Sequence, residues 1–212
     1  MYRLTRLVEV YDYKDGMTLI SELATGGELL DVVTCNKYIT EIEVARIIQQ
    51  ILEGVEYMHS KSIGHLGLTP LDILFSRPGG SEIKICDFSL ARRIVGIVKL
   101  EYGQPEYVSP EIVNGEGASF ASDLWAVGII TYLLLSGVSP FRGQVRITCY
   151  LEMCTLNSRC TPFDLHRICI LESVIVSYSQ ITSTYFIFYL EIAFEKGGKE
   201  RLLYHHFQND FV

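Results

Sequence analysis

Three stretches in the middle of the chain decide its fold: SIGHLGLTPLDILF at residues 62–75, IKICDFSLARRI at residues 83–94 and YGQPEYVSPEIV at residues 102–113. In the second stretch the run from Ile83 to Cys86, apolar except for Lys84, has the length of a short buried strand, and Asp87 follows it directly. A carboxylate at the end of such a strand has no obvious structural role and is suited to bind a hard cation such as Mg²⁺. The stretch therefore predicts a metal ligand at Asp87.

In order and spacing, these stretches resemble the catalytic loop, the metal-binding turn and the activation segment of eukaryotic protein kinases. Ser109-Pro110-Glu111 stands where the family has A-P-E, and Ser122-Asp123-Leu124-Trp125 matches the family's S-D-x-W. The resemblance covers residues 4–143 and is greatest to the Ser/Thr kinases of the titin, obscurin and myosin-light-chain kinase group. It implies an α+β, protein kinase-like fold: mainly the α-helical large lobe, with the last strands of the small lobe.

The resemblance also implies roles for the catalytic loop, and the residues that would carry them are changed. In kinases an Asp accepts the proton of the substrate hydroxyl, a Lys steadies the transferred phosphate and an Asn binds Mg²⁺. Here Gly67 stands at the base position, Thr69 at the Lys position and Asp72 at the Asn position, so no catalytic residue is intact. Asp72 has two open readings, a weak metal ligand beside Asp87 or a solvated loop acid.

Other residues around these motifs have structural roles by family analogy. We expect His65 to pack in the core against Phe88, and Asp123 to bond the backbone of the catalytic loop. Ser89 replaces the glycine of D-F-G and should hinder the rearrangement of that turn, because it has less access to positive φ. The resemblance implies an Arg partner for Glu111 that is not found in this chain, so we expect a buried acid without its partner.

The N-terminal part predicts a hairpin and a hinge. Two β-rich runs, Leu7–Tyr13 and Met17–Glu22, flank Asp15-Gly16, and a linker at 23–27 leads to a short helix at 28–33. By the resemblance Ser21 is the gatekeeper, and four residues would meet the nucleotide: the backbone of Glu22 and Ala24 at adenine, Glu28 at ribose, and Leu74 as the floor. Glu28 is equally well explained as a first-turn carboxylate that the helix dipole favours.

Two long helices should form the core. Thr40-x-x-Glu43 is a capping box, and the residues after it are apolar at helical spacing, at positions 44, 47, 48, 51, 52, 55 and 58. Residues 121–137 are apolar nearly all round, which predicts a helix buried on every side.

Two parts of the kinase pattern are not found. No Gly-rich loop, strand Lys or helix Glu of the small lobe occurs before the hairpin. We therefore take residues 1–144 as a partial kinase domain, with ATP and Mg²⁺ as cofactors by resemblance and with binding weak or absent. Residues 145–212 match no later kinase helix; they are either retained-intron sequence or a divergent tail. Within them, 18 uncharged residues from Ser173 to Leu190 favour an aggregation-prone β segment over a membrane span.

The composition of the chain limits the classes of partner and ligand that it could bind. The net charge of −7 and the lack of a Lys/Arg run argue against nucleic-acid binding. The six Cys form no CxxC pair, which argues against zinc, and no secretory signal is found, so we expect a cytoplasmic protein, sarcomeric by resemblance. Three functions remain open: an inactive pseudokinase that serves as a scaffold for other proteins, an active Ser/Thr kinase in its full-length form, or a non-functional fragment.

Overall fold

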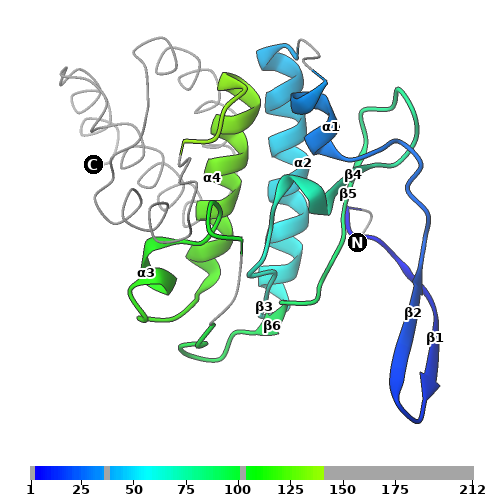
Figure 1. The fold of residues 1–212 in the computed structure, drawn as a ribbon, viewed down its shortest axis with the longest axis vertical. Coiled ribbons are helices and arrows are strands. Elements are labelled where there is room, and N and C mark those ends of the chain that lie inside the picture. Colours follow the sequence, from blue (N-terminus) through cyan, green and yellow to red (C-terminus); the bar gives the residue numbers. More distant parts are fainter. Residues whose placement is uncertain (1–2, 36–38, 101–103, 141–212) are drawn as a thin grey trace, which may run out of the picture.

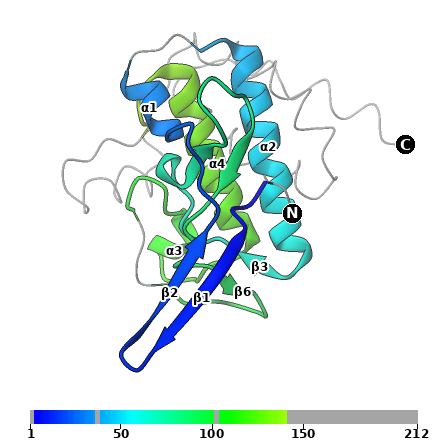
Figure 2. The ribbon, with the colours of Figure 1, turned by 90° about the vertical axis from the view of Figure 1, so that its right-hand side faces the viewer.

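The computed structural model describes residues 3–35, 39–100 and 104–140. These residues form a helical body and a hairpin that projects from it (Figures 1 and 2). In chain order the elements are β1 (Leu7–Tyr13), β2 (Gly16–Ser21), α1 (Leu29–Thr34), α2 (Glu41–Ser60), β3 (Ile63–Gly64), the 3₁₀ turn η1 (Pro70–Asp72), β4 (Ile73–Phe75), β5 (Ile83–Ile85), β6 (Arg92–Arg93), α3 (Pro110–Val113) and α4 (Phe120–Ser136). The mixture of strands and helices confirms the predicted α+β class.

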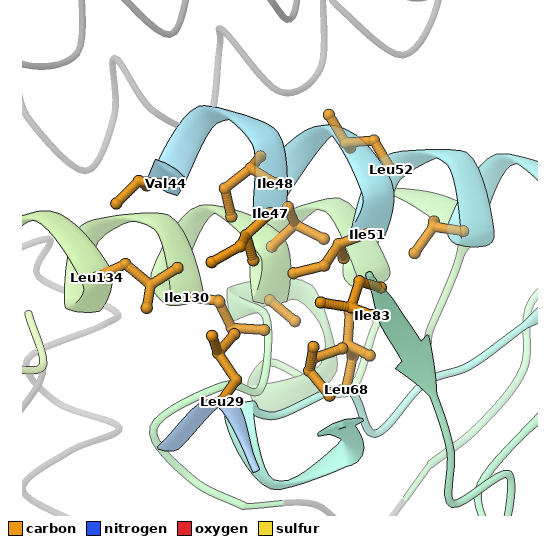
Figure 3. Close-up of a cluster of buried hydrophobic side chains, with 14 of the residues drawn as sticks. Leu29, Val44, Ile47, Ile48, Ile51, Leu52, Leu68, Ile83, Ile130 and Leu134 are labelled. Atoms are coloured by element: carbon orange, nitrogen blue, oxygen red, sulfur yellow. The ribbon is translucent and has the colours of Figure 1, made fainter. Parts of the chain in front are cut away.

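Helices α2 and α4 lie side by side and form the centre of the body (Figures 1 and 3). The predicted capping box is present: Glu43 N donates to Thr40 Oγ1 at 3.3 Å and Thr40 N donates to Glu43 Oε2 at 2.8 Å. All seven predicted apolar positions of α2 are buried, and α4 buries residues all round its axis. Helix α4 ends at Ser136 and is capped by Gly137, whose φ of 74° favours glycine.

Short strands hold the catalytic segments against α2. Strands β4 and β5 pair antiparallel, with Ile73 opposite Ile85, and both side chains are fully buried. The start of the chain joins this sheet, because Ile85 N donates to Arg3 O at 2.7 Å and Thr5 N donates to Ile85 O at 2.9 Å. The core of Figure 3 therefore extends from the two helices to the strand that precedes Asp87.

The hairpin and hinge follow the sequence prediction closely. Strands β1 and β2 pair antiparallel from Leu7 opposite Ser21 to Tyr13 opposite Gly16, and every residue of both strands is exposed. The linker then passes against β4, where Gly26 N donates to Phe75 O at 2.9 Å. A Cβ at Gly26 would lie 2.5 Å from Phe75 Cβ, so this close approach requires glycine. Residues 145–212, including the segment Ser173–Leu190, lie outside the described residues.

Candidate active site

The catalytic loop is fixed by one buried carboxylate. Asp123 of α4 is 1% exposed, and its two oxygens accept from His65 N at 2.9 Å and from Leu66 N at 2.7 Å. His59 Nε2 lies 2.8 Å from the same carboxylate. Leu66 has a φ of 61°, a conformation that is unfavourable for leucine and needs support from its surroundings. The expectation that Asp123 bonds the loop backbone is confirmed.

His65 has the predicted structural role. Its side chain is buried, its Nε2 lies 3.0 Å from the carbonyl oxygen of Cys86, and its ring centroid lies 5.5 Å from that of Phe88. The histidine therefore connects the catalytic loop to the metal-binding turn rather than facing a substrate.

Gly67 and Thr69 stand at the positions that the kinase pattern predicts for a base and a lysine. A Cβ added at Gly67 would lie 2.8 Å from Leu90 Cδ1, so the side chain of Leu90 fills the space beside this position. Thr69 is buried and caps the η1 turn, where its Oγ1 accepts from Leu71 N at 3.2 Å. Neither residue can accept the proton of a substrate or neutralise a phosphate.

Asp72 is a buried turn acid. Its Oδ2 accepts from Thr69 N at 2.8 Å and from Thr69 Oγ1 at 2.9 Å, and the residue is 8% exposed. The solvated-loop reading of Asp72 is therefore wrong. Burial raises the pKa of Asp72 and the charge of Asp87 acts in the same direction, while the hydrogen bonds from Thr69 oppose them.

Asp87 is exposed, and its backbone adopts the unfavourable conformation in the turn Asp87-Phe88-Ser89. Its φ of 56° lies in the left-handed region, which Asp enters more readily than most residues. Ser89 N donates to Asp87 Oδ1 at 3.2 Å. In this conformation positive φ falls on Asp87 and not on Ser89, so the serine is accommodated without backbone strain.

The acids of this site lie near one another. Burial raises the pKa of the Cys86 thiol to about 11, and the charges of Asp72, Asp87 and Glu28 add to the shift. Among the described residues, no group of three or more His, Cys, Asp or Glu side chains is arranged to hold a metal ion. Asp72 and Asp87 alone would hold Mg²⁺ only weakly, because the ion keeps several waters and depends on substrate phosphates for its other ligands.

The predicted nucleotide-binding residues are partly brought together. Glu28 and Leu74 pair in an isolated β-bridge, so the ribose and floor positions are adjacent, while Ala24 is half-buried in the linker. The backbone N–H of Glu22 donates to Arg6 O at 2.9 Å, and the contact of Glu22 with adenine stays a prediction. Glu28 stands at the N-cap of α1, where its backbone N–H donates to Asp31 Oδ2 at 3.2 Å. Its ribose contact and its role as a carboxylate favoured by the helix dipole both stay predictions.

Glu111 differs from expectation. The residue is half-buried rather than buried, and its Oε1 accepts a hydrogen bond from Ser122 Oγ at 2.8 Å. The prediction that Glu111 is a buried acid without a partner is therefore wrong, because Ser122 of α4 donates a hydrogen bond to its carboxylate.

Sequence reasoning missed a groove of about 960 Å³ between the base of the hairpin and the end of α2. Its wall includes Phe88 and the carboxylate of Glu22, which pairs with Lys84 at 2.9 Å. Five basic residues line the groove, although the chain as a whole is acidic: Arg6, Lys61, Lys84, Arg92 and Arg93. The adjacent pair Arg92-Arg93 after the metal-binding turn was the signal available in the sequence.

Comparison with known proteins agrees with this geometry. The protein kinase domain model matches residues 2–170. The chain belongs to the protein kinase family. It is 48% identical over 144 residues to myosin light chain kinase 3 of Rattus norvegicus, a match that covers 66% of this chain and 18% of the rat protein. The human protein of the same name is 47% identical over the same length, with the same coverage.

A more distant relative has the same domain. The death-associated protein kinase dapk-1 of Caenorhabditis elegans is 44% identical over 145 residues, which cover 68% of this chain and 10% of the worm protein. The domain is thus a Ser/Thr protein kinase domain of the myosin-light-chain-kinase-like type, and the chain spans less than a fifth of the length of these relatives. No helix in the described ranges has both the length and the apolar character needed to cross a membrane.

Proposed function

We propose that this chain is a catalytically inactive kinase domain, a pseudokinase that acts by binding other proteins. The observation that carries the proposal is the pair Gly67 and Thr69. One position has no side chain, and the hydroxyl of the other is used in the turn that it caps. General-base catalysis typically contributes about 10²–10⁴-fold to a rate, and glycine cannot provide it.

The charge of the site supports the same proposal. Phosphoryl transfer depends on positioning and on cations that neutralise the phosphates. The described site places Asp72, Asp87 and Glu28 around Cys86, and it has a neutral residue at the catalytic Lys position. Negative groups of this kind repel ATP unless a metal ion and a lysine offset them.

A protein partner in a muscle-type assembly is the setting we propose, with a cytoplasmic, sarcomeric location. Similarity to myosin light chain kinase 3 supports a contractile-tissue context. The titin and obscurin type of giant kinase is our finer proposal for the parent protein. The exposed apolar residues of β1 and β2, such as Leu19 at 61% and Val8 at 57%, support a role in contacts with protein surfaces.

An active Ser/Thr kinase is the second candidate, for a longer protein that contains this chain. The retained Asp87 and the hinge bridge between Glu28 and Leu74 favour it, because both would serve nucleotide binding. A Gly-rich loop and a strand Lys upstream in the same transcript would strengthen this candidate, and Gly67 would still lack a base.

Titration calorimetry with Mg²⁺ and ATP tests the proposal on the full chain. We expect an affinity weaker than about millimolar, which corresponds to less than about 4 kcal/mol of binding free energy. A submillimolar affinity that Asp87→Ala abolishes would show that the site does hold the nucleotide through its metal ligand. The exposed hairpin variant Asp15→Ala is the matched control, because it removes an acid remote from the site.

A further inference from the structure

A small cavity separates the catalytic loop from the turn that precedes α3. Its volume is about 20 Å³, and Leu66, Gly67 and Thr69 line it on one side while Tyr107 and Ser109 line it on the other. Gly67, Thr69 and Ser109 are positions where this chain departs from the kinase motifs, with Gly for Asp, Thr for Lys and Ser for Ala. Three separate departures thus meet at one cavity.

Ser109 brings a polar group into this cavity that the described protein atoms leave unmatched. The residue is 0% exposed, and its Oγ has no hydrogen-bond partner among the described residues. Although Ser109 stands at the N-cap of α3, its side chain makes no capping bond. A buried hydroxyl without a partner is unfavourable, so native proteins usually supply one, often as a buried water.

The cavity has the size and chemistry for a single water molecule. A site needs about 10–15 Å³ to hold one water, and this one offers about 20 Å³. Gly67 lines it with backbone atoms alone, and peptide groups are strong hydrogen-bonding partners. We propose that the cavity is a site for one buried water that bridges Ser109 Oγ to the catalytic loop at Gly67.

Such a water would connect the catalytic loop at Gly67 to the segment at Ser109. It would lie in space that the side chains of an intact catalytic loop would fill. It accounts for a serine at 109, because an alanine there would leave the water with fewer partners than it needs. The inference rests on the cavity and on Ser109, and it holds whether or not the chain transfers phosphate.

Water-to-amide cross-relaxation in the ¹⁵N-labelled full chain tests the proposal. We expect the backbone amides of Gly67 or Leu68 to show contact with a long-lived water, and Ser109→Val, which fills the cavity with methyl groups, to abolish it. Thr131 is the matched control: it is fully buried and its hydroxyl donates to Val127 O at 2.8 Å, so its amide should show no water contact.

The possible results distinguish a bound water from an empty cavity. Absence of the water signal at both amides of the unmodified chain, or a signal unchanged in Ser109→Val, overturns the proposal. If Ser109→Val does not fold, Ser109→Ala carries the test through its thermal midpoint. A bound water makes the alanine variant melt at a lower temperature, because the water loses a partner. An empty cavity makes it melt at a higher one, because an unmatched hydroxyl is removed.

Discussion

The backbone N–H of Leu66 donates to Asp123 Oδ1 at 2.7 Å, joining residues 57 positions apart in the sequence. This bond holds leucine in a left-handed conformation, at the position where the catalytic loop turns toward Gly67. The adjacent His65 N–H is bonded by the other oxygen of the same carboxylate. The shape of the catalytic loop thus depends on one aspartate of α4.

Removing that aspartate should destabilise the protein strongly. Asp123→Ala leaves two buried N–H groups without an acceptor, and we expect a loss of about 3–5 kcal/mol in the free energy of unfolding. Asp123→Asn keeps one acceptor oxygen and should lose about half as much. Urea unfolding of the two variants checks this, and equal stability of Asp123→Ala and the unmodified chain would refute the anchoring role.

The buried carboxyl of Asp72 should make stability depend on pH. Its pKa is raised in the folded state, so its contribution is fully favourable below the ordinary value of 3.8 and is lost as pH rises through the folded pKa. Asp72→Asn should therefore gain stability relative to the unmodified chain as pH rises from 3 to 7, with little difference at pH 3, which lies below the ordinary pKa of 3.8. Urea midpoints at the two pH values measure it. A difference that grows on acidification contradicts the assignment, and the exposed Asp15→Asn serves as control.

The thiol of Cys86 should react slowly. With a pKa of about 11, roughly one thiol in a thousand is ionised at pH 8. The exposed Cys35 in the same chain is an internal reference, and site-resolved mass spectrometry after iodoacetamide treatment should show it modified at least about tenfold faster. Asp87→Asn removes a nearby negative charge and should speed the alkylation of Cys86 alone. Equal rates at the two thiols would contradict the raised pKa of Cys86.

Filling the empty base position should be tolerated at a cost. A methyl group at Gly67 meets Leu90 Cδ1 at 2.8 Å, and this flexible side chain can move, so we expect Gly67→Ala to lose about 1 kcal/mol. Gly128 within α4 is the matched control, because a Cβ there meets no heavy atom within 4 Å, and Gly128→Ala should gain about 0.5–1 kcal/mol. Thermal unfolding of both variants measures the difference. If Gly67→Ala gained as much stability as the control, Leu90 could not be filling that space.

Local signals in the sequence predicted much of the fold. The capping box at Thr40 and Glu43, and the apolar spacing that follows it, determined α2 because both act within a few residues. The roles of His65 and Asp123 followed from the family pattern, since the elements they join occur in a fixed order. The sequence could not show three tertiary features. These are the hydrogen bond from Ser122 to Glu111, the side chain of Leu90 in the space at Gly67, and the burial of Asp72. Each depends on how segments of the chain pack in three dimensions, for which no local pattern exists.

The absence of phosphoryl transfer is the central claim, and radiolabelled phosphate transfer from ATP to a generic protein substrate tests it most directly. The unmodified full chain should transfer no measurable phosphate above a blank without protein. The double variant Gly67→Asp, Thr69→Lys should also stay inactive, because Leu90 fills the space beside position 67 and phosphoryl transfer depends on positioning. Transfer by the unmodified chain that Asp87→Ala abolishes and Asp15→Ala leaves intact would contradict the account.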